Sequence, residues 1–236
     1  MLVNDELILH AVTLEGADFS GARPRYLDIG VGSTLTRCDF SGIRPVGPPT
    51  FGSGAEPTTY VECTFDHMSI KGGGAGRANF VRCSFLGVVI KDYRFIDSQF
   101  TDCRFSGDLA AVIFTARPSF GFALRERNAF IGNDFSAARL RDVDFRGGID
   151  LRLQRLPVGP EYIVVPSAER VLLKAWRTIS ARSNDEDRKR AQTKLEVLER
   201  LVEEGQSDIF LTRSFLAGGL SVEWASTFVG LFCDEP

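Results

Sequence analysis

Phenylalanine recurs on a five-residue grid along much of this chain. Eleven of its 19 phenylalanines share one phase of that period. They are Phe40, Phe65, Phe80, Phe85, Phe95, Phe100, Phe105, Phe120, Phe130, Phe135 and Phe145. Helices bury residues at a period of 3.6 and strands at a period of 2, so neither element explains the grid. Each unit of five must make one side of a coil and send one large side chain inward, which predicts a solenoid.

The other positions of the five-residue unit also favour particular residue types. The residue two places before each large apolar one is usually small, as at Cys38, Cys63, Cys83 and Cys103. The residue one place before is mostly polar. Each unit is therefore expected to contribute two inward residues, one large and one small, and three that face water.

Several units carry a recognisable motif. They are Ala17-Asp18-Phe19, Cys38-Asp39-Phe40, Ala78-Asn79-Phe80, Cys83-Ser84-Phe85, Cys103-Arg104-Phe105, Asn133-Asp134-Phe135, Ala138-Arg139-Leu140 and Val143-Asp144-Phe145. This pattern resembles the pentapeptide-repeat family over residues 12–151. The resemblance implies a mainly β fold, a right-handed quadrilateral β-helix in which four units complete each coil.

Residues one coil apart should then lie above one another at the inter-strand spacing. Cys63, Cys83 and Cys103 are expected to form an interior column. Glu62, Arg82 and Asp102 are expected to form an exterior column of alternating charge. The predicted core consists of Phe40, Phe65, Phe80, Phe85, Phe95, Phe100, Phe105, Phe130, Phe135, Leu140 and Phe145.

The grid weakens in three places. Near residues 21–32 its phase slips by one residue, which predicts a bulge or turn. Residues 43–58 are rich in Pro and Gly and are expected to form a loop. Residues 107–127 keep the phase but lose its chemistry at Ala110, Thr115 and Arg125, so we expect a second projecting loop, or one degenerate coil plus a loop. Candidate partner-binding residues on these loops are Phe51, Phe114, Phe120, Phe122, Arg125 and Arg127.

The period changes after residue 155. Residues 1–155 are assigned to the repeat coil and residues 156–236 to an α-helical region. Helices are expected from Ser167 to about Ser183 and from Asn184 to Gly205, with shorter ones starting at Ser207 and Ser221. This region is interpreted as a cap on the C-terminal coil, and a homodimer interface through the same helices is the alternative.

Composition fits a cytoplasmic, non-membrane protein. Charged residues make up 25% of the chain, the formal net charge is −3, and Asp5 and Glu6 interrupt the apolar start that a secretion signal needs. Four of the five cysteines occupy small inward positions and are expected to be reduced.

No catalytic centre is predicted. The two histidines, His10 and His67, belong to no recognisable nucleophile or metal motif, and the glycine run 72–76 lacks the ending of a phosphate loop. We therefore expect no enzyme activity, no cofactor and no metal site.

Two functions remain open. The first is non-catalytic protein binding through coil faces and loops, as a scaffold, immunity or effector-type module. The second is implied by the resemblance: protection of a type II topoisomerase, DNA gyrase or topoisomerase IV, from drugs or toxins by imitation of DNA. Imitation needs a strongly acidic surface, but residues 1–155 hold 18 acidic and 18 basic residues. No direct nucleic-acid binding is expected.

Overall fold

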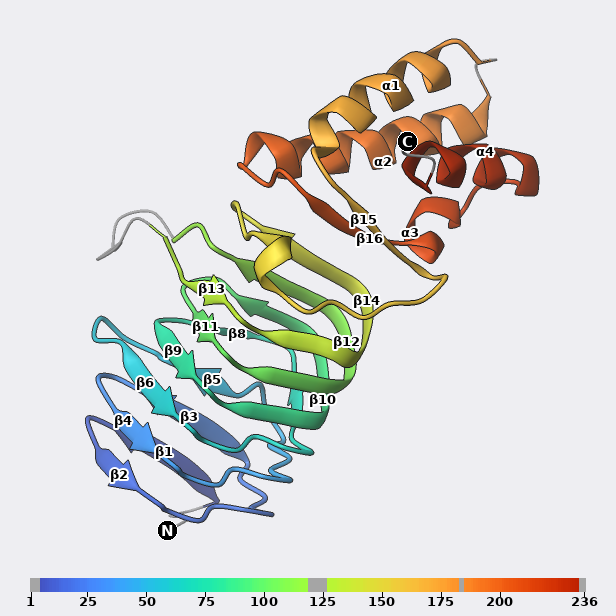
Figure 1. The fold of residues 1–236 in the computed structure, drawn as a ribbon. Helices are drawn as coiled ribbons and strands as arrows, with labels where there is room; N and C mark the ends of the chain where they lie inside the picture. Colours follow the sequence, from blue (N-terminus) through green and yellow to red (C-terminus); the bar gives the residue numbers. More distant parts are fainter. Residues whose placement is uncertain (1–4, 119–126, 183–184, 234–236) are drawn as a thin grey trace. The chain divides into compact units, whose positions relative to one another are not determined.

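The computed structural model describes residues 5–118, 127–182 and 185–233 (Figure 1). The chain divides into two compact units. The first comprises residues 1–144 with 152–157, and the second comprises residues 145–151 with 158–236. Each unit is described by itself below.

The first unit is a parallel β-helix. Tyr60 pairs with Phe80 and Phe80 pairs with Phe100, so each coil there takes 20 residues. Within one such coil Phe80, Phe85, Ile90 and Phe95 are all buried. Four inward side chains spaced five residues apart give the coil four sides, as the grid predicts.

One side of the coil is a six-stranded parallel sheet with the order β13-β11-β9-β6-β4-β2 (Figure 1). Its strands are β2 (Thr13–Glu15), β4 (Thr34–Thr36), β6 (Thr58–Val61), β9 (Ala78–Val81), β11 (Gln99–Thr101) and β13 (Phe130–Ile131). Their central residues point inward and the flanking residues point outward, because side chains alternate along a strand.

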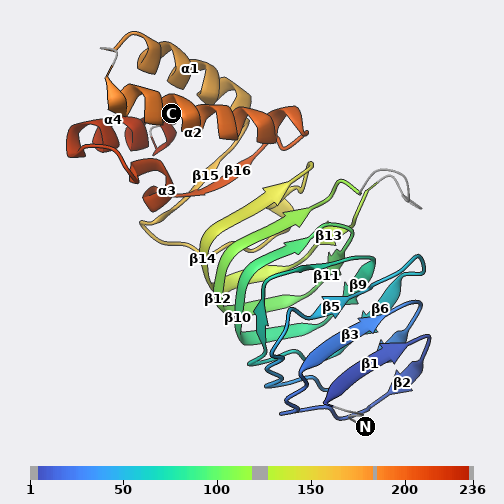
Figure 2. The same ribbon diagram turned by 180° about the vertical axis from the view of Figure 1, so that it is seen from behind.

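Two further sheets complete the coil. Figure 2 shows the sheet β1-β3-β5, made of β1 (Glu6–His10), β3 (Tyr26–Gly30) and β5 (Thr50–Phe51). The other contains β7 (Ser69–Lys71), β8 (Gly74–Ala75), β10 (Ser84–Phe95), β12 (Arg104–Thr115) and β14 (Asp134–Arg146). The last three strands are long enough to pass around a corner of the coil.

Stacked aromatic rings fill the axis of the coil. Phe65, Phe85, Phe105 and Phe135 form one column, with successive ring centroids 4.8, 4.8 and 4.4 Å apart and planes within 7°. All eleven residues of the predicted core are buried. Large, flat side chains at one position of every coil can stack at the strand spacing, which links the sequence grid directly to the register.

The expected phase slip occurs where one residue is added. Glu6–His10 pair with residues 20 positions later, whereas Leu14 pairs with Leu35. The extra residue therefore lies between Gly30 and Thr34. Phe19 is half-buried, with its ring stacked on Phe40 at 5.1 Å.

Residues 43–58 lengthen one coil, since Leu35 pairs with Tyr60, but they do not form a loop throughout. Thr50 and Phe51 form β5, and Phe51 is only 1% exposed. The prediction that Phe51 is an exposed, partner-binding side chain is therefore wrong. The Phe51 ring packs against the rings of Tyr60, Phe65, Phe80 and Tyr93, with centroids 5.8 to 6.4 Å apart.

Residues 107–115 are coil rather than loop. Phe85 pairs with Phe105, but Val88 pairs with Gly107, so this coil lacks one residue at its corner. The inward residues become Leu109 and Phe114, both 0% exposed, in place of the grid positions Ala110 and Thr115. Phe114 is consequently a core residue and not a partner-binding one, which corrects the prediction.

The remaining part of that segment is only partly described. Phe120, Phe122 and Arg125 lie outside the described residues, and Arg127 is exposed. Phe100 pairs with Phe130, 30 residues later, so about ten residues are added to the coil between them.

The second unit combines helices with a short antiparallel sheet. Its elements are η1 (Leu151–Leu153), which spans the boundary between the units, β15 (Tyr162–Val165), α1 (Ala168–Ser180), α2 (Glu186–Glu203), β16 (Ile209–Thr212), α3 (Arg213–Ala217) and α4 (Val222–Cys233). The prediction that a helix starts at Ser207 is wrong. Residues 209–212 pair with β15 as a strand instead, and the helix begins at Arg213.

The helices of the second unit pack around their own core. Ala175, Ile179, Ala191, Leu195 and Phe228 are fully buried within it. Both tryptophans of the chain, Trp176 and Trp224, belong to this core or pack against it. No helix among the described residues is long and apolar enough to cross a lipid bilayer.

Candidate interaction surface

The outer side of the six-stranded sheet is unlike the rest of the coil surface. Strands β4, β6, β9, β11 and β13 contain no charged residue, although 25% of the chain is charged. We call the outward residues of these five strands the neutral face. They are Thr34, Thr36, Thr59, Val61, Asn79, Val81, Gln99, Thr101 and Ile131.

The neutral face consists of two ladders. One runs through Thr34, Thr59, Asn79 and Gln99, and the other runs through Thr36, Val61, Val81, Thr101 and Ile131. The amide group of Gln99 donates to Asn79 Oδ1 at 2.7 Å and accepts from the backbone N–H of Ala129 at 3.0 Å. These amide groups already have partners within the chain, so covering them with another surface would cost little hydrogen bonding.

Charges of alternating sign line one edge of the neutral face. Arg37, Glu62, Arg82 and Asp102 occupy equivalent positions in four successive coils, all with φ between 51° and 54°. Arg82 donates from Nε and Nη2 to Glu62 Oε1, at 3.1 and 2.9 Å. Arg37 Nη1 lies 3.8 Å from Glu62 Oε2. The predicted exterior column is confirmed for Glu62 and Arg82, and Arg37 extends it by one coil.

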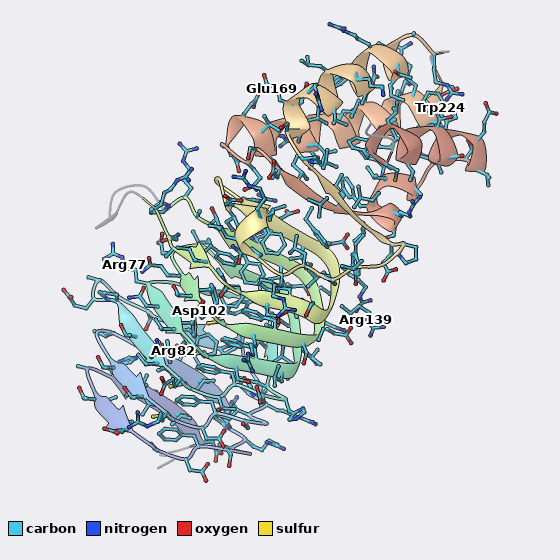
Figure 3. The ribbon with its side chains drawn as sticks, in the orientation of Figure 1. Arg77, Arg82, Asp102, Arg139, Glu169 and Trp224 are labelled. Atoms are coloured by element: carbon cyan, nitrogen blue, oxygen red, sulfur yellow. The ribbon has the colours of Figure 1, made fainter. Side chains whose placement is uncertain are left out.

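A second pair of charges lies at the other edge. Arg77 and Asp97 are 20 residues apart and precede the equivalent strands β9 and β11, so they occupy equivalent positions in adjacent coils. Figure 3 shows Arg77, Arg82 and Asp102 along the same side of the coil. The neutral face is therefore bordered on both edges by charges of both signs.

Acidic groups on the other sides of the coil also have basic partners. Arg139 binds Asp108 through two hydrogen bonds, of which Nη2 to Oδ2 measures 2.7 Å. The Arg139 hydrogen bond holds the pKa of Asp108 below its usual range. Arg155 Nη1 lies 3.4 Å from Asp134 Oδ2. The charges of Asp108 and Asp134 are therefore compensated by arginines of the same chain.

The structure brings together three residues that sequence reasoning left apart. Asp28 is 8% exposed, and its Oδ2 lies 2.8 Å from His10 Nε2 while its Oδ1 accepts from Ser53 Oγ at 2.8 Å. His10 and Ser53 both bind the carboxylate rather than each other, so the arrangement differs from a catalytic triad. The sequence signal that could have revealed this cluster is an aspartate between Leu27 and Ile29 in an otherwise apolar strand.

The predicted cysteine column forms inside the coil. The thiols of Cys63, Cys83 and Cys103 donate to Leu35, Tyr60 and Phe80 carbonyl oxygens at 3.3, 3.4 and 3.5 Å. A hydrogen bond with Cys83 and burial raise the pKa of Cys63, and burial is the main cause of the raised pKa of Cys83. Buried thiols with raised pKa values are poor nucleophiles, which makes this column structural.

Within the described residues, no group of three or more His, Cys, Asp or Glu side chains could hold a metal ion.

No family model matches the chain, and no curated protein matches it. Sixteen chains of solved structures show similarity, among them the two described next. QnrB1, a plasmid-mediated fluoroquinolone resistance protein, is 17% identical over 64% of this chain and 81% of its own, with a TM-score of 0.24.

The second is a pentapeptide repeat protein, Rfr23, from the cyanobacterium Cyanothece 51142. It is 8% identical over 65% of this chain and 92% of its own, with a TM-score of 0.26. Similarities at these TM-scores decide neither fold nor function. The assignment of a pentapeptide coil therefore rests on this chain's own grid and register.

Proposed function

We propose that this pentapeptide-repeat chain is a non-catalytic protein-binding module and that the neutral face is its binding surface. The observation that carries the proposal is a run of five strands without a charged residue, bordered by charged side chains on both edges. Protein interfaces have this composition, because charged residues are depleted at their centres and polar groups surround them.

Imitation of duplex DNA has less support. A DNA-like partner surface would present acidic groups in sequence along the coil, whereas Glu62, Asp108 and Asp134 each lie within 4 Å of an arginine. Paired charges of opposite sign weaken the field at a distance, and that field is what would attract a DNA-binding enzyme. Protection of a topoisomerase by this route is therefore the second candidate only.

Site-specific photo-crosslinking in the native cells tests the proposal. With the photo-crosslinker p-benzoyl-L-phenylalanine in place of Val61, irradiation should give a discrete covalent adduct whose protein component is identified by mass spectrometry. The matched control places the same group at Val89, which is partly exposed on β10 outside the neutral face. Adducts absent at position 61, or equally abundant at both positions, would contradict the proposal. A topoisomerase subunit in the adduct would favour the second candidate.

We also propose that the coil is right-handed and that the helical region closes its C-terminal end. Parallel crossover connections are almost always right-handed, and a solenoid end is an unpaired edge that must be covered. Residues 145–151, which continue β14, belong to the same unit as the helices, and Gln206 binds the N–H and C=O groups of Ile149.

A chain that ends after Pro157 tests the capping role. The uncovered edge is expected to pair with other molecules, so light scattering should show large aggregates where the full chain gives small, uniform particles. A truncated chain that stays uniform in size and keeps its β-sheet circular dichroism would show that the end needs no cap.

A further inference from the structure

We infer that the neutral face binds a second copy of this chain, face to face. The two coils run antiparallel, with a two-fold axis directed along the strands and lying between β6 and β9. This inference rests on the proposed binding role of the neutral face, and it names the partner. Its basis is that the two central valines and the alternating charged column Arg37, Glu62, Arg82 and Asp102 match themselves under this symmetry operation.

Symmetry determines which residues meet. A two-fold rotation about an axis along the strands reverses the order of the coils but keeps each residue's position along its strand, as an isologous interface requires. Strand β6 then faces the partner's β9, and β4 faces the partner's β11. Val61 meets the partner's Val81, so the two apolar residues at the centre of the face cover each other.

The polar positions of the face match in the same way. Thr36 meets the partner's Thr101, and Thr59 meets the partner's Asn79. No charged residue lies in the contact between β4, β6, β9 and β11 and their partner strands, and Glu15 on β2 meets the partner's Ile131 only at the end of the face. Because the Asn79 and Gln99 side chains are hydrogen-bonded to each other within one chain, covering them leaves that bond intact.

The alternating column at one edge favours this axis. With the axis between β6 and β9, Arg37 meets the partner's Asp102 and Glu62 meets the partner's Arg82. At the opposite edge Arg77 meets the partner's Pro57, so no charges meet there. Both meetings along the alternating column join opposite charges, which favours association and discriminates against a register shifted by one coil.

Neighbouring axes fail this test. An axis through β6 would place Glu62 against the partner's Glu62 and Arg37 against the partner's Arg82. An axis through β9 would place Arg82 against the partner's Arg82 and Glu62 against the partner's Asp102. Like charges would meet in all four cases. The alternating column therefore favours the axis between β6 and β9. It opposes a dimer in which one chain is shifted along the other by one coil.

The interface is small. Five strands at about 4.8 Å spacing cover roughly 20 Å along the coil. Specific interfaces of this size are at the weak, reversible end of the observed range. We therefore expect a dimer that dissociates in the micromolar range and becomes weaker as salt screens its charged edges.

Sedimentation velocity over about 1 to 500 μM protein at low ionic strength provides the first test. The full chain should shift from monomer to dimer, and the variant Val61→Asp/Val81→Asp should remain a monomer throughout, a rise in dissociation constant of at least about 100-fold. The control Val89→Asp should behave like the unchanged chain. The variant Val61→Lys/Val81→Asp should dimerise again, because each lysine meets an aspartate.

A charge exchange provides the second test. The variant Glu62→Arg/Arg82→Glu keeps opposite charges facing each other in its own dimer and should self-associate. In a mixed dimer with the unchanged chain, glutamate would face glutamate and arginine would face arginine. Native mass spectrometry of an equimolar, mass-tagged mixture should therefore show mixed dimers reduced about ten-fold below random pairing.

Three results would overturn the inference: a monomer at all concentrations, a dimer that survives Val61→Asp/Val81→Asp, or random mixing in the charge exchange. A surviving dimer would point to the C-terminal helices as the interface. The photo-crosslinking experiment separates this failure from failure of the proposed function. An adduct of position 61 with a different protein would end the self-association inference alone, whereas no adduct at that position would end both.

Discussion

Replacing Phe100 by alanine is expected to lower the free energy of unfolding by about 3 to 5 kcal/mol, because truncation of a fully buried ring leaves a cavity. Phe100 is 0% exposed, and its ring stacks on Phe80 at 4.8 Å. Further rings lie around it, with centroids at 5.1 to 6.2 Å: Phe85, Phe95, Phe105, Phe114 and Phe130, the nearest being Phe95. Equilibrium denaturation followed by far-ultraviolet circular dichroism measures the loss.

The matched control is Ile131→Ala on the outer side of the same sheet. Ile131 is 49% exposed and should change the free energy of unfolding by less than about 1 kcal/mol. Equal effects of the two substitutions would contradict the inward direction of the grid. We also expect the Phe100 variant to lose structure in neighbouring coils, since a solenoid is stabilised by contacts between adjacent repeats.

Replacing Gly107 by alanine should be comparably severe, although only one methyl group is added. Gly107 has φ +96°, and a Cβ atom there would lie 2.3 Å from the Val88 carbonyl oxygen and 2.6 Å from the Val88 nitrogen. Both obstacles are backbone atoms of the paired strand, so they cannot move aside as a flexible side chain would. Strain and overpacking together predict a loss of about 3 kcal/mol or more, measured by the same denaturation.

Gly16→Ala is the appropriate comparison for that substitution. Gly16 also has positive φ, at +63°, but nothing lies within 4 Å of an added Cβ atom. Its equivalents in later coils, Arg37, Glu62 and Arg82, already carry side chains at similar φ values. The loss should therefore be near 1 kcal/mol. Equal losses in the free energy of unfolding for Gly107→Ala and Gly16→Ala would contradict the close approach of Gly107 to the Val88 backbone.

The fold was largely predictable because one side chain type marks each coil. A phenylalanine every fifth residue both fills the axis and sets the register, so the grid predicted the inward direction of Phe80, Phe85 and Phe100 together. The neutral face could not be recognised as readily. Its residues are ordinary threonines and valines, and they become a surface only when strands 20 or more residues apart are aligned.

A single-residue change in coil length accounts for the error at Phe114. Removal of one residue near Gly107 moves Leu109 and Phe114 inward, yet in the sequence it looks like a loss of the repeat. Phe51 was predicted to be exposed because proline and glycine surround it, whereas its ring packs against Phe65, Phe80 and Tyr93 from later in the chain. The register between coils depends on residues that are 20 or more positions apart. The composition of a short segment therefore does not reveal it.

The placement of both tryptophans gives the two units separate optical signatures. Trp176 and Trp224 belong to the helical unit, and the Arg182 guanidinium lies 4.4 Å from the Trp224 ring centroid. Excitation at the long-wavelength edge, where only tryptophan absorbs, therefore reports on the helical unit alone, while the far-ultraviolet circular dichroism signal also contains the β-strands of the coil. Melting each unit can be followed in one intact chain, without cutting it or attaching a dye.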